Sequence, residues 1–252
     1  MDLEKYRVSP TELERTVDLL GLVPNSGKTA LDIGARDGHF SKLLAGRYKN
    51  VIALDLNLPQ IDHPRVSCVQ GNATQLTYGD RSMDLVFCTE VLEHIPSTFL
   101  GIVCSELQRV CRDRLIVGVP FRQDTRVGRL TCTSCGQPNP PWGHVNVFNE
   151  ESLASLFPAC RVERVTFVGK NSSFTNPLSA ALMDYAGNPY GTYDQEEACV
   201  YCDEKFTSPP ARNLIQKIAT KAAVWINNPI RTLKPVRANW MHMLLVKHAE
   251  VR

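Results

Sequence analysis

The chain of 252 residues is long enough to bury one large core without disulfide or metal staples. Its 28 Lys and Arg residues nearly balance its 26 Asp and Glu residues, so the whole protein is not expected to bind nucleic acid by charge alone. No apolar run approaches the roughly 18 residues needed to cross a bilayer, and residues 1–8 are polar and charged, so neither a membrane span nor a cleavable leader is expected.

The predicted elements alternate along the chain. Ser9-Pro10-Thr11-Glu12 is typical of a helix start, with a serine cap and a proline at the first position, and Gly21 ends this helix. Strands are then predicted near 29–33, 51–55, 66–69, 84–89, 114–119, 161–168 and 240–246, and helices near 38–46, 97–112 and 150–157. This alternation predicts an α/β fold, with a parallel sheet that helices cover on both faces. Ligands of such sheets bind beyond the carboxyl ends of the strands.

The turn after the first strand indicates a nucleoside ligand. Leu31-Asp32-Ile33 is followed by a turn with Gly34 and Gly38, whose glycines let backbone amides approach a ligand closely. The second apolar strand ends in Asp55, and an acid there can accept hydrogen bonds from ribose hydroxyls. On these residues alone the ligand is either a dinucleotide or another adenosine cofactor.

Two further stretches narrow the choice. Gly71-Asn72-Ala73 follows the third strand, and Glu90-Val91-Leu92-Glu93-His94-Ile95 follows the fourth. With these motifs in this order, the chain resembles a class I S-adenosylmethionine-dependent methyltransferase over roughly residues 10–170 and the last strand. The resemblance implies a Rossmann-like, mostly parallel seven-stranded sheet. It also implies S-adenosyl-L-methionine as the methyl donor.

The resemblance assigns cofactor-binding roles to particular residues. Asp32 and the glycine turn are expected to hold the amino-acid part of the cofactor, and Asp55 the ribose. The full set is Asp32, Gly34, Ala35, Arg36, Gly38, Asp55, Leu56, Asn72, Ala73, Thr89 and Glu90. Two positions depart from the family pattern, which usually has glycine at position 36 and more often aspartate at position 72.

Two histidines are candidates for the general base. His94 lies within a helical turn of Glu90, and His144 precedes the helix predicted at 150–157, where related methyltransferases often carry a histidine near the acceptor. Histidine suits proton removal near neutral pH. The alternatives are that His94 only anchors its loop and that His144 is structural.

Two Cys-x-x-Cys pairs predict a structural zinc site. Cys132 and Cys135 form one pair, the second followed by glycine, and Cys199 and Cys202 form the other. Four thiolates leave no open position for water, so the zinc would not be catalytic. The alternatives are a redox role, unpaired thiols, or three cysteines completed by His144. The remaining five cysteines stand singly in predicted strands or helices, which suits a reducing, cytoplasmic location.

Each Cys-x-x-Cys pair forms a metal-binding knuckle, and the two knuckles lie in insertions between segments of the core. We expect a cofactor-binding core at 1–120, an insertion with the first knuckle at 121–149, and a core helix and strand at 150–169. A second insertion at 170–238 carries the other knuckle and a basic helix, and the last core strand and tail occupy 239–252. Strands five and six run parallel in this family, so both insertions should leave the same edge of the sheet and form a zinc-stapled subdomain.

The carboxyl-terminal part is basic. From Lys205 onward the only acid is Glu250, and residues 211–227 predict an amphipathic helix. Such a helix suits an anionic membrane surface, a phosphorylated acceptor or RNA. The plainer alternative is a helix that packs on the domain with a solvated basic face, in which Trp225 and Trp240 belong to the core.

The sequence therefore predicts an enzyme that methylates an O or N nucleophile of a small molecule, such as a sugar or a glycan- or lipid-linked intermediate. Peripheral membrane contact through the basic carboxyl-terminal segment is expected, and nucleic acid is not. Two rival functions stay open. One is an RNA methyltransferase, and the other is a non-catalytic zinc scaffold on a methyltransferase frame, which the arginine at position 36 motivates.

Overall fold

The computed structural model describes residues 7–233 and 236–248. Contacts between residues divide the chain into two compact units. The core unit contains residues 10–121, 148–169 and 240–252, and the insertion unit contains 122–147 and 170–239 together with the first nine residues.

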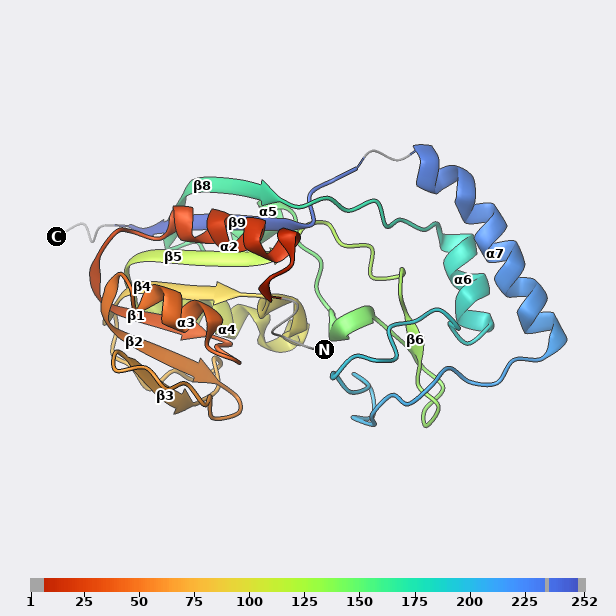
Figure 1. Ribbon diagram of the computed structural model, residues 1–252, viewed down its shortest axis with the longest axis horizontal. Coiled ribbons are helices and arrows are strands. Elements are labelled where there is room, and N and C mark those ends of the chain that lie inside the picture. Colours follow the sequence, from red (N-terminus) through yellow and green to blue (C-terminus); the bar gives the residue numbers. More distant parts are fainter. Residues whose placement is uncertain (1–6, 234–235, 249–252) are drawn as a thin grey trace. The chain divides into compact units, whose positions relative to one another are not determined.

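The core unit is built on a seven-stranded sheet in the order β3-β2-β1-β4-β5-β9-β8 (Figure 1). The strands are β1 (Gly27–Ile33), β2 (Tyr48–Asp55), β3 (Val66–Gln70), β4 (Met83–Thr89), β5 (Cys111–Pro120), β8 (Cys160–Val168) and β9 (Trp240–Lys247). Neighbours among the first five are parallel, and β9 is antiparallel to both β5 and β8. The predicted Rossmann-like, mostly parallel seven-stranded fold is confirmed.

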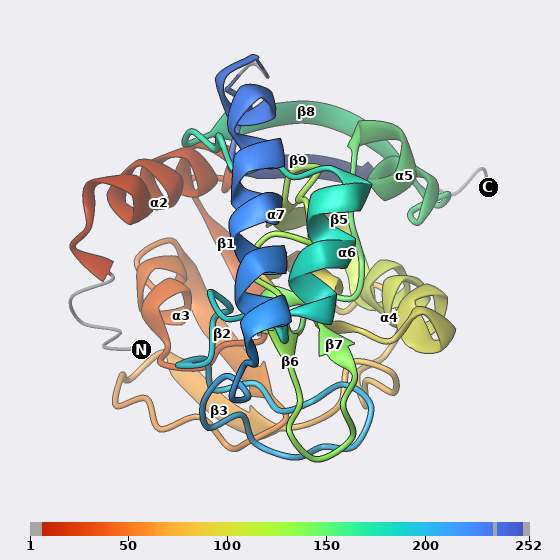
Figure 2. The same cartoon turned by 90° about the vertical axis from the view of Figure 1, so that its right-hand side faces the viewer.

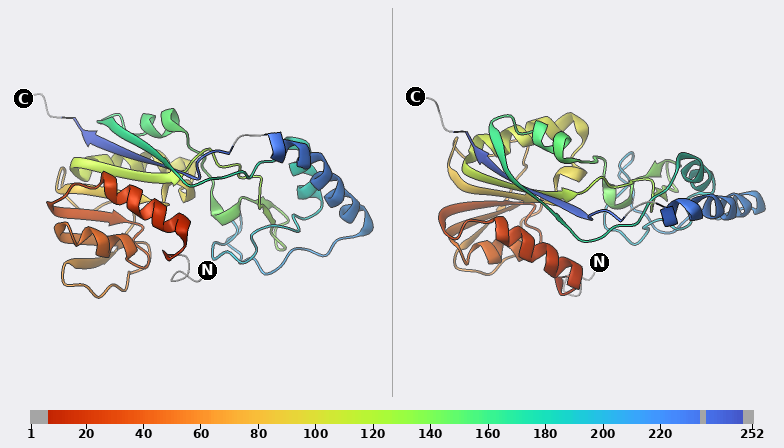
Figure 3. Two further views of the ribbon diagram at one scale, coloured as in Figure 1. Left: turned by 45° about the horizontal axis from the view of Figure 1, so that its top comes forward. Right: turned by 90° about the horizontal axis from the view of Figure 1, so that it is seen from above.

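Helices cover both faces of the sheet (Figure 3). On one face lie α2 (Pro10–Leu22) and α3 (His39–Leu44), and on the other lie α4 (Ser97–Val110) and α5 (Glu150–Ser155). Strand β4 shows why both faces need cover, because Phe87 packs with the α2 and α3 cluster while the next residue, Cys88, packs with the α4 cluster. A strand buried on both sides reads as a continuous apolar run.

The register of β9 explains where the insertions begin. Trp240 pairs with Pro120, the last residue of β5, and also with Val168, the last residue of β8. Because both neighbours of β9 end at the same level, the chain leaves the sheet twice from one edge. This is the arrangement that the parallel course of strands five and six predicts.

The insertion unit contains a short hairpin and a pair of helices. The hairpin is β6 (Leu130–Thr131) with β7 (Pro138–Asn139), followed by the 3₁₀ helix η2 (Pro141–Gly143). The helices α6 (Pro177–Tyr185) and α7 (Leu214–Leu233) lie side by side (Figure 2). The expected helix at 211–227 is thus found three residues later and runs past Pro229, while α6 was not expected. Among the described residues, no helix is both long and apolar enough to cross a membrane.

Candidate functional site

The glycine turn after β1 has the geometry that only glycine accepts easily. Gly34 and Gly38 have φ angles of 74° and 76°, in the left-handed region. A Cβ added to Gly34 would lie 2.4 Å from Val91 Cγ2, and one added to Gly38 would lie 2.5 Å from Ile61 Cδ1. The turn therefore depends on glycine for both its backbone and its packing.

Asp55 ties this turn to the end of β2. Its Oδ2 accepts a hydrogen bond from the backbone nitrogen of Arg36 at 2.9 Å. Arg36 has a φ angle of 44°, so the position where the family usually has glycine keeps a left-handed backbone here. The Arg36 side chain is exposed and is not among the residues that line the adjacent hollow.

A hollow of about 300 Å³ lies beyond the ends of four neighbouring strands. It is lined by Ile33, Gly34, Leu54, Asp55, Leu56, Gly71, Asn72, Ala73, Thr74, Glu90, Val91, His94, Ile95, Pro96 and Phe99. Seven of the sequence-predicted site residues are in that lining, from β1, β2, β3 and β4. The other cofactor candidates, Asp32, Ala35, Arg36, Gly38 and Thr89, lie in the same turn or strand ends but do not line it. Their roles stay predictions.

Two of the candidates have internal hydrogen bonds that limit what they offer a ligand. Asp32 is 3% exposed, and its Oδ2 accepts a hydrogen bond from Ser41 Oγ at 2.5 Å, which ties β1 to α3. Asn72 Oδ1 accepts from the backbone nitrogen of Thr74 at 2.9 Å. Asn72 therefore holds its turn through its oxygen and presents its Nδ2 as a donor.

Glu90 is the most constrained side chain of the hollow. It has a φ angle of 56°, its Oε2 accepts a hydrogen bond from Trp240 Nε1 at 3.1 Å, and its Oε1 is buried without a hydrogen-bond partner among the described residues. Burial raises the pKa of this carboxyl, and the nearby Arg15 guanidinium partly opposes the rise. Left-handed backbone at a non-glycine residue is often found at functional sites.

Glu93 is a second buried acid beside Glu90, and sequence reasoning did not single it out. It is 0% exposed, and neither of its carboxylate oxygens has a hydrogen-bond partner among the described residues. Burial, followed by the charge of Glu90, raises the pKa of Glu93 well above its usual value. Two buried acids therefore share a site that favours keeping a proton.

Helix α2 supplies the positive charge of this cluster. Arg15 is 3% exposed, and its Nη1 donates to both carboxylate oxygens of Glu12, at 3.1 and 2.8 Å. Its guanidinium also lies 5.4 Å from the ring centroid of Trp240 and 5.5 Å from that of Phe40. The spacing of three residues between Glu12 and Arg15 was a readable signal for this ion pair.

The two candidate bases lie in different units. His94 belongs to the core unit, ends the 3₁₀ helix η1 (Leu92–His94) and lines the hollow. His144 belongs to the insertion unit, is 8% exposed, and its Nδ1 lies 2.6 Å from Gln123 Oε1. Which of them acts as a base stays a prediction.

The four knuckle cysteines converge within the insertion unit. Their sulfurs all lie within 4.8 Å of one another, with 3.7 Å between Cys132 and Cys202 and 3.7 Å between Cys135 and Cys199. These distances are far too long for disulfides. A tetrahedron with metal–sulfur bonds of about 2.3 Å has edges of about 3.8 Å, so the cluster fits one zinc ion.

The two knuckles share one backbone design. The residue after the second cysteine is left-handed in both, with φ angles of 73° at Gly136 and 59° at Asp203. The buried Asn139 joins them, because its Oδ1 accepts from the backbone nitrogen of Val200 at 2.9 Å. His144 is not part of this cluster, so the geometry favours four cysteines over three cysteines and a histidine.

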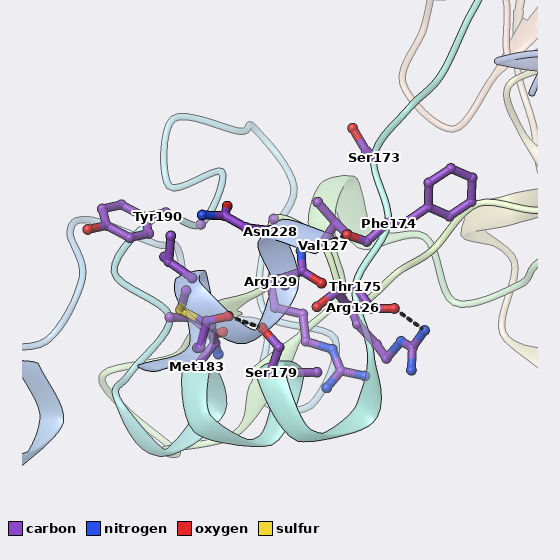
Figure 4. Close-up of a pocket in the computed structure, with 17 residues that line it drawn as sticks. Arg126, Val127, Arg129, Ser173, Phe174, Thr175, Ser179, Met183, Tyr190 and Asn228 are labelled. Carbon is purple, nitrogen blue, oxygen red and sulfur yellow. Dashed lines mark hydrogen bonds between the residues drawn. The ribbon is translucent and has the colours of Figure 1, made fainter. Parts of the chain in front are cut away.

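A second hollow, of about 260 Å³, lies within the insertion unit (Figure 4). Tyr190 lies on one side of it and Arg126 on the other. Its lining mixes aromatic, hydroxyl and amide groups with two arginines that are held in place by acids: Arg126 Nε donates to Asp124 at 2.8 Å, and Arg129 Nη1 donates to Asp184 at 2.8 Å. No sequence motif predicted this hollow.

Comparison with known proteins agrees with the geometry of the core unit. Residues 31–115 match a family model described as a methyltransferase domain. A Mycobacterium tuberculosis protein named "Probable S-adenosylmethionine-dependent methyltransferase" is 30% identical over 138 residues, which are 52% of this chain and 47% of that protein. A similarly named protein of Mycolicibacterium smegmatis is 29% identical over 145 residues, 55% of this chain and 53% of its own. The chain thus spans about half the length of these curated relatives.

Solved structures share the fold at low identity. The N-methyltransferase NodS from Bradyrhizobium japonicum, in complex with S-adenosyl-L-homocysteine, aligns with a TM-score of 0.51 at 18% identity, over 65% of this chain and 82% of its own. The YcgJ protein from Bacillus subtilis aligns with a TM-score of 0.55 at 12% identity, over 94% and 99%. Residues 31–115 are thus similar to a methyltransferase domain, and the solved structures share the fold of the chain.

Proposed function

We propose that the protein transfers a methyl group from S-adenosyl-L-methionine to an oxygen or nitrogen of a small molecule that carries a sugar, either free or as part of a glycan- or lipid-linked intermediate. The observation that carries the first half of this proposal is the hollow at the ends of β1 to β4. It brings Asp55, Asn72 and Glu90 together although they are far apart in sequence. A volume of about 300 Å³ is at the lower end of ordinary ligand sites.

The lining fits the parts of a sulfonium nucleoside. Asp55 offers a carboxylate at a strand end for the ribose hydroxyls, while Asn72 and the Ala73 amide offer donors for the adenine edge. Glu90 presents a buried oxygen with no other partner, which suits the cationic methionine end. The likeness of the fold to that of NodS, whose structure is known in complex with S-adenosyl-L-homocysteine, supports a ligand of this class.

Methyl transfer requires little chemistry from the protein itself. The bound cofactor supplies an electrophilic methyl group on a sulfonium; as the acceptor's O–C or N–C bond forms, the S–C bond breaks and a neutral thioether leaves. The protein must align the acceptor and take up one proton from it. His94 lines the hollow and is the residue that we propose as the base, with His144 as the second candidate.

The hollow of the insertion unit supports the acceptor class. Hydroxyl and amide groups beside Tyr190 and Phe174 suit a sugar, whose rings stack on aromatic side chains and whose hydroxyls need polar partners. Arg126 and Arg129 also line the hollow, but each is paired with an acid, so neither argues for a negatively charged acceptor. We assign this hollow to the binding of a sugar.

The four cysteines are proposed to hold one structural zinc ion. The support is the chemistry of the donors and the distances between sulfurs of 3.7 Å, close to the edge of a zinc–thiolate tetrahedron. The ion would join two segments that are distant in sequence. Cys132 and Cys202 are 70 residues apart, and Cys135 and Cys199 are 64 residues apart. A cytoplasmic location remains the expectation from the sequence.

Isothermal titration calorimetry with S-adenosyl-L-methionine tests the proposed function. The wild type should bind, and Asp55→Ala should weaken binding by tenfold or more, because about 1.4 kcal/mol per tenfold is within the range of a lost charged hydrogen bond. Asp113→Ala, at an exposed position of β5, is the matched control. Absence of binding by zinc-replete wild-type protein would favour the non-catalytic scaffold, and unchanged affinity in Asp55→Ala would remove the assignment of the hollow.

A further inference from the structure

The helix pair of the insertion unit packs through its small residues. Where α6 and α7 meet, the buried residues are Ser179 and Ala180 on α6 and Ala219, Thr220 and Ala223 on α7. Ser179 Oγ donates to the backbone oxygen of Ala223 at 2.8 Å. Small residues allow two helices to approach closely, but they bury little apolar surface.

The large apolar side chains of the pair point to solvent instead. The exposed set, with exposed fractions, is Leu178 58%, Tyr185 54%, Leu214 73%, Ile215 64%, Ile218 58% and Trp225 77%. On α7, Leu214, Ile218 and Trp225 are four and seven residues apart, so they form one stripe along the helix. The sequence-based expectation that Trp225 belongs to the core was wrong, whereas Trp240 is 7% exposed.

The charges beside the stripe have one sign. Lys217 and Lys221 are exposed on α7, and the described part of this helix contains no acid. On α6 the only acid is Asp184, which is neutralised by Arg129 at 2.8 Å. An apolar stripe that contains a largely exposed tryptophan and is flanked by lysines is typical of a helix that lies in a membrane interface.

We propose that the exposed face of α7, with Leu214, Ile218 and Trp225 as apolar anchors and Lys217 and Lys221 as cationic contacts, docks on a membrane surface that contains anionic lipids. A second copy of the chain is a poorer occupant, since a two-fold interface on this stripe would bring lysines of like charge together. Nucleic acid would leave the apolar stripe in water. Resting on the proposed methyl transfer, this surface implies that the acceptor is lipid-linked.

Vesicle co-sedimentation tests the proposal with the full chain. We expect the wild type to bind vesicles of phosphatidylcholine mixed with phosphatidylglycerol, and much more weakly to bind phosphatidylcholine alone. Binding should fall as salt rises, because surface charges are screened. The double variant Ile218→Ser/Trp225→Ser should lose tenfold or more in partitioning. Lys217→Gln/Lys221→Gln should reduce binding only to the anionic vesicles.

A matched control is Val17→Ser, since Val17 is 71% exposed on α2 and belongs to the core unit, whereas the stripe belongs to the insertion unit. It should bind vesicles like the wild type. Failure of the wild type to bind anionic vesicles, or equal binding by the Ile218→Ser/Trp225→Ser variant, would overturn the proposal. The proposal would also be overturned if light scattering found that the wild type is a dimer and that the Ile218→Ser/Trp225→Ser variant is a monomer.

The outcome is separable from that of the proposed function. Calorimetric binding of S-adenosyl-L-methionine without vesicles should be the same for the wild type and for Ile218→Ser/Trp225→Ser, because neither residue lines either hollow. Unchanged cofactor affinity also shows that the core unit of the variant is folded, and hydrogen exchange in residues 170–233 shows whether the insertion unit is folded. If the cofactor does not bind but the vesicles do, the methyltransferase proposal fails and the docking surface stands.

Discussion

Trp240 Nε1 donates a hydrogen bond to Glu90 Oε2 at 3.1 Å and so joins the first residue of β9 to the end of β4, across 150 positions of sequence. The same indole ring contacts the Arg15 guanidinium from α2. Glu90 is thus held from two elements while its backbone is left-handed at 56°. The last strand therefore does more than close the sheet, because it orients a side chain of the cofactor hollow.

Trp240→Phe should lower both stability and cofactor affinity. Phenylalanine keeps most of the ring but removes the donor, so the Glu90 carboxyl loses a buried partner. We expect a loss of about 1–3 kcal/mol in the free energy of unfolding. Affinity for S-adenosyl-L-methionine should fall several-fold, because Glu90 no longer has one orientation. Urea unfolding and calorimetry measure the two effects, and Trp225→Phe, on the exposed stripe, should show neither.

Glu93→Gln should change how stability depends on pH. The pKa of Glu93 is raised in the folded protein, so the folded state binds the proton more tightly than the unfolded state does. The wild type therefore loses stability as pH rises from near the ordinary glutamate value of 4.5 towards the raised pKa of the folded state. Glutamine does not titrate. The variant should therefore gain relative to the wild type as pH rises, as followed by urea unfolding at several pH values.

Glu106→Gln is the control with the opposite sign. The hydrogen bond from Arg109 lowers the pKa of Glu106, so its contribution is present above the unfolded pKa and fades as the solution becomes acidic. This variant should be weakened relative to the wild type at neutral pH and should approach it in acid. Parallel curves for Glu93→Gln and the wild type would show that Glu93 does not hold a proton.

Much of the core unit could be predicted from the sequence, because parallel strands that are buried on both faces appear as continuous apolar runs. The apolar run that ends at Thr89 predicts a strand, and Gly34 and Gly38 predict a tight turn. The structure has both, as strand β4 and as a turn with left-handed glycines. The exposure of Trp225 was not readable, since hydrophobicity does not say which surface covers a side chain. Helix α6 was missed although Asn176 and Pro177 form a recognisable cap. Burial of Glu93 at 0% exposure depends on tertiary packing, which no local pattern encodes.

Arg36→Gly tests what the departure from the family pattern does. A left-handed non-glycine residue costs about 1–2 kcal/mol, and glycine loses about 0.5–1 kcal/mol more in chain entropy on folding. The variant should therefore equal or exceed the wild type in stability by up to about 1.5 kcal/mol. Cofactor affinity distinguishes two roles for the side chain: unchanged affinity means that only the backbone of Arg36 is used, through Asp55. A clear loss of stability would contradict the strain seen at its φ angle of 44°.

Removal of the metal should unfold the insertion unit before the core unit. Elemental analysis of the purified wild type should find about one zinc per chain, and Cys132→Ser/Cys199→Ser should lose it. The unit should then unfold, because a four-thiolate site contributes on the order of 10 kcal/mol of folding energy. Cys68→Ser, at a cysteine outside the knuckles, should keep the zinc. In hydrogen exchange, the chelated protein should lose protection in residues 122–147 and 170–239, while β1 to β5 keep theirs. A metal-free wild type with full protection in both segments would contradict the zinc site, because the unit would then be stable without the ion.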